Sequence, residues 1–118
     1  MAVVRAGLVG VFLTAGPLWA EDWQRLTGPQ ITVALEQHVV RHDNGSEQVF
    51  SYGGLTRYRR GWLNEGHWRV TGDHYCSVWP PQTLWQCYDV ATSADGRRVR
   101  FTDAQGRTAL ATIATEVE

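Results

Sequence analysis

The chain has 118 residues and a mass of 13.3 kDa, which excludes a two-domain enzyme with a dinucleotide-binding fold and a separate substrate domain. Charged residues make up 19% and apolar residues 43% of the chain, the balance of an ordered globular domain. With a formal net charge of −1, the chain lacks the broad positive field of a nucleic-acid binder, so no nucleic-acid partner is predicted.

The first twenty residues are typical of a signal peptide. Arg5 is the only charged residue among them, residues 6–15 form an apolar run, and Gly16-Pro17 ends it. A short membrane anchor is the alternative, but a spanning helix needs about twenty apolar residues and this run is half as long. We therefore expect residues 1–20 to be removed on export, with residues 21–118 forming one domain, periplasmic or secreted, that has no further membrane span.

Residues 26–37 carry the helix signal. Thr27 is a suitable N-cap, Gln30 completes a capping box with it, and Pro29 sits in the first turn, where its missing N–H costs nothing. The spacing of the apolar residues places them on one face, which would pack on a larger element. These residues are Ile31, Ala34 and Leu35.

The rest of the chain alternates short extended runs with turn signals such as Asn44-Gly45, Gly53-Gly54 and Asp95-Gly96. This pattern predicts a mainly β fold, in which the N-terminal helix packs on an antiparallel up-and-down meander of seven or eight strands. A small barrel and a sandwich both fit. The expected strands are 38–41, 47–52, 55–60, 65–71, 74–79, 83–90, 98–102 and 108–115.

Cys76 and Cys87 are the only cysteines, and in a small exported domain they are expected to pair as a structural disulfide. A redox pair or half of a metal site is the alternative, but the sequence has no C-x-x-C motif. If the two cysteines face each other across a hairpin, Trp79 lies opposite Leu84 and residues 80–83 form the loop.

Several short motifs resemble those of a family of small exported bacterial proteins of unknown function, over roughly residues 26–101. Some members of that family carry the name dihydrodipicolinate reductase, but the resemblance implies no catalytic residues. A pyridine-nucleotide reductase needs a glycine-rich turn between a strand and a helix, and residues 21–118 contain none, so no cofactor is predicted. The matching motifs are Leu26-Thr27-Gly28, Tyr52-Gly53-Gly54, Gly66-His67-Trp68, Cys76-Ser77-Val78-Trp79 and Cys87-Tyr88.

Two groups of residues that contain histidine are candidates for chemistry. His38 and His42 have a spacing that suits a metal ion on a helix, but on a strand their rings lie about 13 Å apart, so no metal site is predicted. His67, Asp73 and His74 flank a turn and would form a general acid–base group if they converged. Alternatively, Asp73 only accepts backbone hydrogen bonds in the turn.

Tryptophan is unusually frequent after residue 20. Trp68 and Trp79 are interpreted as core residues that pack on the disulfide, whereas Trp62 is the best candidate for exposure. Exposed aromatic rings beside arginine stack sugars, planar ligands or a partner's side chains, so residues 57–62 are a candidate interaction patch. The alternative is an edge strand that is charged to prevent edge-to-edge pairing. The binding residues predicted in this patch are Arg57, Tyr58, Arg59 and Trp62.

The main functional hypothesis is a non-enzymatic module. It would bind a small ligand in a barrel mouth or cleft, or bind a protein or envelope polymer through the aromatic–arginine patch. An apolar cavity lined by tryptophans would favour the ligand, and a filled core with Trp62 exposed would favour the macromolecular partner. The alternative is a small enzyme, which requires His67, Asp73 and His74 to meet in one pocket.

Overall fold

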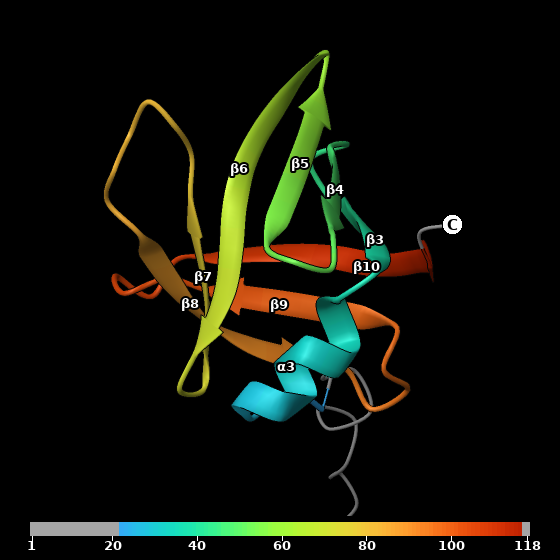
Figure 1. The fold of residues 1–118 in the computed structure, drawn as a ribbon. Coiled ribbons are helices and arrows are strands. Elements are labelled where there is room, and N and C mark those ends of the chain that lie inside the picture. The colour runs from blue at the N-terminus through green and yellow to red at the C-terminus, as the bar shows by residue number, and fades with distance from the viewer. Residues whose placement is uncertain (1–21, 117–118) are drawn as a thin grey trace, which may run out of the picture.

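The computed structural model describes residues 22–116, so the predicted leader lies outside the described residues. Within these residues, one short helix, α3 (Gly28–Leu35), precedes eight strands that form a closed antiparallel barrel, and a further short strand, β2 (Gln24–Arg25), pairs with β8 (Figure 1). The barrel strands are β3 (His38–His42), β4 (Glu47–Phe50), β5 (Leu55–Arg60), β6 (Trp62–Thr71), β7 (His74–Val78), β8 (Gln86–Thr92), β9 (Arg98–Thr102) and β10 (Thr108–Glu116).

The order of the strands confirms the predicted up-and-down meander. Of the two predicted architectures, a small barrel and a sandwich, the structure is a barrel. Each strand from β3 to β10 pairs with the next, and β10 then pairs with β3 through His42↔Ala111 and Val40↔Ile113. Closure leaves the barrel without a free edge. The alternative of a charged edge strand at residues 55–60 is therefore wrong, since β5 is paired on both sides, with β4 and with β6.

Helix α3 begins as predicted. The backbone N–H of Thr27 donates to Gln30 Oε1 at 2.9 Å, and Pro29 lies in the first turn. The helix is shorter than the 26–37 expected, because Glu36 already has extended backbone angles and Gln37 has a φ of 65°. That bend turns the chain directly into β3. Within residues 22–116, no helix is long and apolar enough to cross a membrane.

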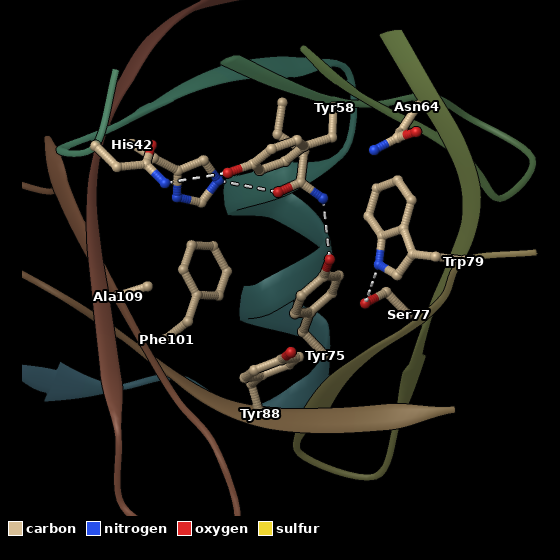
Figure 2. A pocket seen from close by; sticks show the side chains of 11 residues that line it. His42, Tyr58, Asn64, Tyr75, Ser77, Trp79, Tyr88, Phe101 and Ala109 are labelled. Carbon is tan, nitrogen blue, oxygen red and sulfur yellow. Dashed lines mark hydrogen bonds between the residues drawn. The ribbon is translucent and has the colours of Figure 1, made fainter. Parts of the chain in front are cut away.

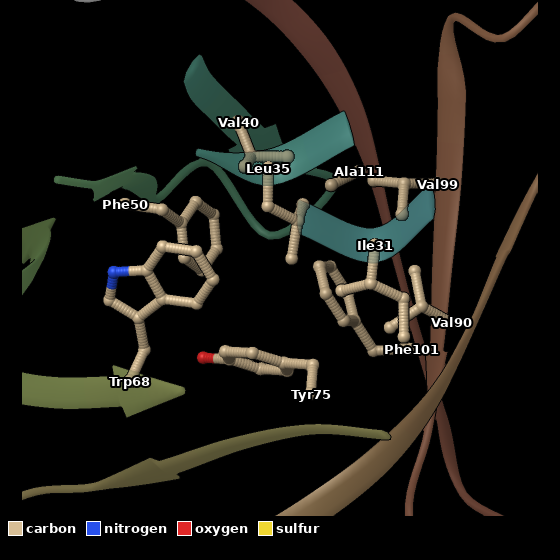
Figure 3. Packing of buried hydrophobic residues seen from close by; sticks show 10 residues of the cluster. All are labelled: Ile31, Leu35, Val40, Phe50, Trp68, Tyr75, Val90, Val99, Phe101 and Ala111. Atoms are coloured by element: carbon tan, nitrogen blue, oxygen red, sulfur yellow. The ribbon is translucent and has the colours of Figure 1, made fainter. Parts of the chain in front are cut away.

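The helix closes one end of the barrel. The N–H of Gly28 donates to Asp73 Oδ1 at 2.7 Å, which ties the start of α3 to the β6–β7 turn. Ile31 and Leu35 are fully buried and point among the strand side chains (Figure 3). Burial of each stabilises the fold by about 1.5–3 kcal/mol. Because α3 leads into β3, the turns after β3, β5, β7 and β9 all lie at the opposite end of the barrel (Figure 1).

The aromatic core lies between α3 and the middle of the barrel. Phe50 meets Trp68 and Tyr75 edge to face, each with ring centroids 5.5 Å apart. Trp68 is buried, and its indole N–H donates to the carbonyl of Ser51 at 3.0 Å. Trp68 is thus a core residue as predicted. Its predicted packing on the disulfide is wrong, because it faces the interior whereas Cys76, which alternates with inward-facing Tyr75, faces the outer side.

The disulfide Cys76–Cys87 is present, and its two residues face each other in the β7–β8 ladder with Cα atoms 4.0 Å apart. On the same outer face, the guanidinium of Arg69 lies 3.9 Å from the centroid of the Trp85 ring. The ladder ends at Ser77↔Gln86, so the predicted pairing of Trp79 with Leu84 does not form. Residues 79–85 are a loop instead.

Replacement of both Cys76 and Cys87 by alanine should lower the melting temperature by well over about 5 °C. Closing a loop of this length removes about 2.5–3 kcal/mol of unfolded-chain entropy, and a domain of this size loses about 4–8 °C per kcal/mol. A thermal melt followed by circular dichroism measures the change, with the reduced wild-type protein as the control. An unchanged melting temperature would contradict a structural role for the crosslink.

Candidate functional site at the open end of the barrel

A cavity of about 350 Å³ opens at the end of the barrel opposite α3 (Figure 2). Every barrel strand, or a turn that adjoins it, contributes at least one side chain. Within the described chain, no acidic or arginine side chain lines this cavity. The lining residues are His42, Asn44, Gln48, Tyr58, Asn64, Tyr75, Ser77, Trp79, Tyr88, Phe101 and Ala109.

The floor of the cavity is a hydrogen-bonded network centred on Gln48. Its amide nitrogen donates to Thr56 Oγ1 at 3.0 Å and to the Tyr75 hydroxyl at 3.1 Å, while its amide oxygen lies 3.0 Å from Nε2 of His42 (Figure 2). Both amide hydrogens are engaged, so the oxygen must accept and Nε2 of His42 must carry the proton. Neutral His42 therefore presents the lone pair of Nδ1 as a hydrogen-bond acceptor.

The two ionisable groups of this network are neutral near pH 7. Burial lowers the pKa of His42, and the hydrogen bond to Gln48 and the charge of Asp43 offset only part of that effect. Burial also raises the pKa of Tyr75 to about 12, against the opposing effect of its hydrogen bonds to Ser77 and Gln48. The floor of the cavity is therefore polar but uncharged.

Aromatic rings form the walls. Tyr58 packs between His42, at a centroid distance of 5.7 Å, and Trp79, which it meets edge to face at 6.1 Å. On the other side, Tyr75 stacks on Tyr88 at 5.6 Å. The Tyr58 hydroxyl accepts a hydrogen bond from the amide nitrogen of Asn44 at 3.1 Å, so its own hydrogen is available to donate.

Trp79 owes its position to Gly66. A Cβ atom at residue 66 would lie 2.6 Å from a carbon of the Trp79 ring and 2.6 Å from the carbonyl oxygen of Val78, so only glycine lets the indole lie against β6. The indole N–H donates to Ser77 Oγ at 3.3 Å. Trp79 is half-buried and lines the cavity, so its predicted place in the core, packed on the disulfide, is wrong.

The predicted interaction patch is divided between two faces of β5. Tyr58 points into the cavity, whereas Arg57 and Arg59 lie on the outer face, because side chains alternate along a strand. Arg57 is also engaged, with its Nε 2.8 Å from Glu65 Oε2. Trp62 is 70% exposed, as predicted, and lies at the β5–β6 hairpin. Of the four predicted binding residues, the structure therefore places only Tyr58 in the cavity.

The three residues of the alternative acid–base site are not brought together. His67 pairs with Val78 along β6, Asp73 accepts the hydrogen bond from the helix, and Nε2 of His74 lies 3.1 Å from Asp89 Oδ1. The enzyme hypothesis requires these three residues to meet in one pocket, and in this arrangement they do not. The arrangement agrees with the simpler interpretation of Asp73 as an acceptor of backbone hydrogen bonds.

The other histidine pair lies along β3, at its two ends. Nδ1 of His38 bonds to the carbonyl of Glu36, while His42 belongs to the cavity. In the described part of the chain, no cluster of three or more His, Cys, Asp or Glu side chains is placed to hold a metal ion.

Sequence reasoning missed four main residues of the cavity, namely His42, Gln48, Asn64 and Tyr88. The available signal was an even spacing along a strand from a core position. His42, Gln48 and Tyr88 lie two residues from Val40, Phe50 and Val90, and Asn64 lies four residues from Trp68.

Compared with known proteins, the chain matches no family model, no curated protein and no solved structure. The resemblance to small exported bacterial proteins stays a prediction, and the site is interpreted from its own geometry.

The depressed pKa of His42 predicts that the protein loses stability as the pH falls from 7.5 to 5.5. In this range the unfolded chain, with a histidine pKa of about 6.5, takes up a proton that the folded state does not, so the free energy of unfolding decreases. Urea unfolding measures the slope, and His42→Gln should reduce it. The pKa values of Asp43, Asp95 and Asp103 are lowered below 3.8, so protonation of these carboxylates affects stability only at a pH below this range. An NMR titration of His42 with a pKa of 6.5 or above would contradict the interpretation.

Gly66→Ala should destabilise the protein by about 1–3 kcal/mol, the usual cost of forcing an extra methyl into a packed site. The cost should be smaller in a Trp79→Ala background, since one of the two obstructing groups is then absent. Urea unfolding of the four proteins in this double-mutant cycle measures the coupling. Equal costs in the two backgrounds would show that Trp79 does not occupy the space that Gly66 leaves.

Proposed function

We propose that the protein is a non-enzymatic binding module that holds a small molecule with an uncharged, partly aromatic body in the open end of its barrel. The observation that carries this proposal is the cavity itself. All eight strands contribute to it, its walls are aromatic, and the buried polar groups of its floor bond to one another. A concave, largely apolar site with a few directed polar groups is the usual form of a small-molecule site.

The size of the cavity limits the ligand. Its volume of about 350 Å³ lies at the low end of the range of about 300–1,000 Å³ that small-molecule sites span, so the ligand body is small. Planar groups would pack against the rings of Tyr58, Trp79 and Tyr88. Nδ1 of His42 would accept a hydrogen bond from the ligand, and the Tyr58 hydroxyl would donate one.

Binding is favoured over catalysis by the partners of His42. A histidine that acts as a general base is commonly oriented by a carboxylate, which stabilises the imidazolium that forms. Here Nε2 of His42 donates to the amide of Gln48, which offers no negative charge, and burial favours the neutral ring. These properties suit the recognition of a hydrogen-bond donor.

An exported location is part of the proposal. It is supported by the signal-peptide pattern of residues 1–20 and by the Cys76–Cys87 disulfide, which fits an oxidising compartment such as the periplasm or the exterior of the cell. Both features suit an extracytoplasmic carrier or sensor of a small molecule. A role in binding a protein or an envelope polymer rests on the exposure of Trp62 alone.

The uncharged fluorescent probe N-phenyl-1-naphthylamine tests the cavity. The wild-type protein should bind it with an increase in fluorescence, and Ala109→Phe, which fills the cavity from β10, should weaken binding by at least about tenfold, or about 1.4 kcal/mol. Ala94→Phe adds the same group at an exposed turn beside the closed end and should bind like the wild type. Equal binding by all three proteins would place the probe elsewhere and contradict the proposal.

Native mass spectrometry of the protein purified without denaturation tests for the natural ligand. Additional non-covalent mass, absent from Ala109→Phe, would support the proposal and show the class of the ligand. Binding of a protein or envelope fragment that persists in Ala109→Phe and is lost in Trp62→Ala would instead favour the macromolecular partner.

A further inference from the structure

The geometry points to a second part of this site on the β5–β6 hairpin, where Arg60 and Trp62 would hold an anionic group of the ligand. We infer that the ligand is an acidic amphiphile, whose uncharged body fills the cavity and whose carboxylate, phosphate or sulfonate lies at the rim. This inference rests on the proposed function and adds the charge and orientation of the ligand to it.

The strand register places Arg60 and Trp62 on the wall of the cavity. Tyr58 pairs with Asn64 and Arg60 pairs with Trp62, and one further pair, Arg59↔Leu63, lies between them in the β5–β6 ladder. Residues two apart on a strand share a face, and paired residues of antiparallel strands share it as well. Since Tyr58 and Asn64 line the cavity, Arg60 and Trp62 continue the same wall about 7 Å further out, beyond the rim.

Arg60 differs from the other arginines in its surroundings. Arg59 lies opposite Glu47 in the β4–β5 ladder, and Arg97 lies beside Asp95, whose pKa it helps to lower. Among residues 22–116, Arg60 is exposed, forms no ion pair, and has Trp62 as its cross-strand neighbour. The arginines that do have partners are Arg25, Arg41, Arg57, Arg98 and Arg107, which form ion pairs, and Arg69 and Arg100, which stack on tryptophan rings.

The chemistry of the pair suits an oxyanion that adjoins an apolar body. A guanidinium can donate two parallel N–H bonds to a carboxylate, phosphate or sulfonate, and it stays charged at every physiological pH. Trp62, 70% exposed, offers an apolar ring beside that charge, at the point where a ligand body would leave the cavity. The cavity and the hairpin together therefore form one site with an uncharged interior and a cationic rim.

Two probes that share one body separate the two parts of the site. 1-Anilinonaphthalene-8-sulfonate carries a sulfonate on the ring system of N-phenyl-1-naphthylamine. Arg60→Gln should weaken binding of the sulfonate probe by about three- to tenfold, the range of an exposed to partly desolvated charge-assisted contact, and should leave the uncharged probe within about twofold of wild type. Raising the ionic strength should weaken the binding of the sulfonate probe only, because salt screens its charge from Arg60.

Matched variants at the closed end provide the controls. Arg97→Gln removes one positive charge from the β8–β9 turn and should change the affinity of neither probe. Trp62→Ala should weaken the binding of the sulfonate probe. Tyr52→Ala removes a comparably exposed ring (77%) from the β4–β5 turn and should leave that binding unchanged. All four substituted side chains are exposed, so the variants are expected to fold.

The outcomes separate this inference from the proposed function. If neither probe binds the wild-type protein, the proposed function fails. If both probes bind and Arg60→Gln behaves like Arg97→Gln, ligand binding in the cavity is supported and recognition of an anionic group at the rim is contradicted. Equal weakening of both probes by Arg60→Gln would also overturn recognition of an anionic group by Arg60.

Discussion

The pairing of β3 with β10 is the contact on which the rest of the structure depends. Every other barrel pair joins strands that follow one another in the chain, but this pair brings His42 beside Ala111. Two further contacts reinforce the seam. The side chain of Arg98 donates to both carboxylate oxygens of Asp43 at 2.9 Å, and the backbone N–H of Asp43 donates to the carbonyl of Leu110. Without this closure the meander would have two free edges and would enclose no space, so the cavity is a consequence of the seam.

The two ends of the barrel differ because α3 fills only one of them. Ile31 and Leu35 occupy the end next to the helix, and the residue that β4 contributes to the core beside them is Phe50 (Figure 3). Two residues earlier on the same face of β4, Gln48 is buried, and its amide groups are engaged by Thr56, Tyr75 and His42. A buried amide without partners would be costly, but this one is satisfied by the protein and therefore forms a stable polar floor.

Local features of the fold could be predicted from the sequence, whereas the site depended on contacts between distant residues. The helix cap, the turns and the Cys76–Cys87 register each involve residues close in the chain or one hairpin, so short patterns suffice for them. The open end of the barrel follows from closure and from the position of α3, which no short pattern encodes. Strand alternation predicts that residues 57–60 are divided between two faces. Composition alone groups Tyr58 with its arginine neighbours and hides this division. The space for Trp79 depends on Gly66 of another strand.

The distribution of charge also orients any acidic ligand. An ionised group loses its hydration on entering a cavity, and that cost is recovered only if a cation or several hydrogen-bond donors replace the water. Among the described residues, no arginine lines the cavity, and its one histidine is held neutral by burial. If the ligand is acidic, as proposed, its acid group would be most stable at the rim, where water and Arg60 would both reach it, and the uncharged body would enter first. In that orientation Nδ1 of His42 meets the inner end of the body, so the barrel would select for a hydrogen-bond donor at one end of its ligand and an anion at the other.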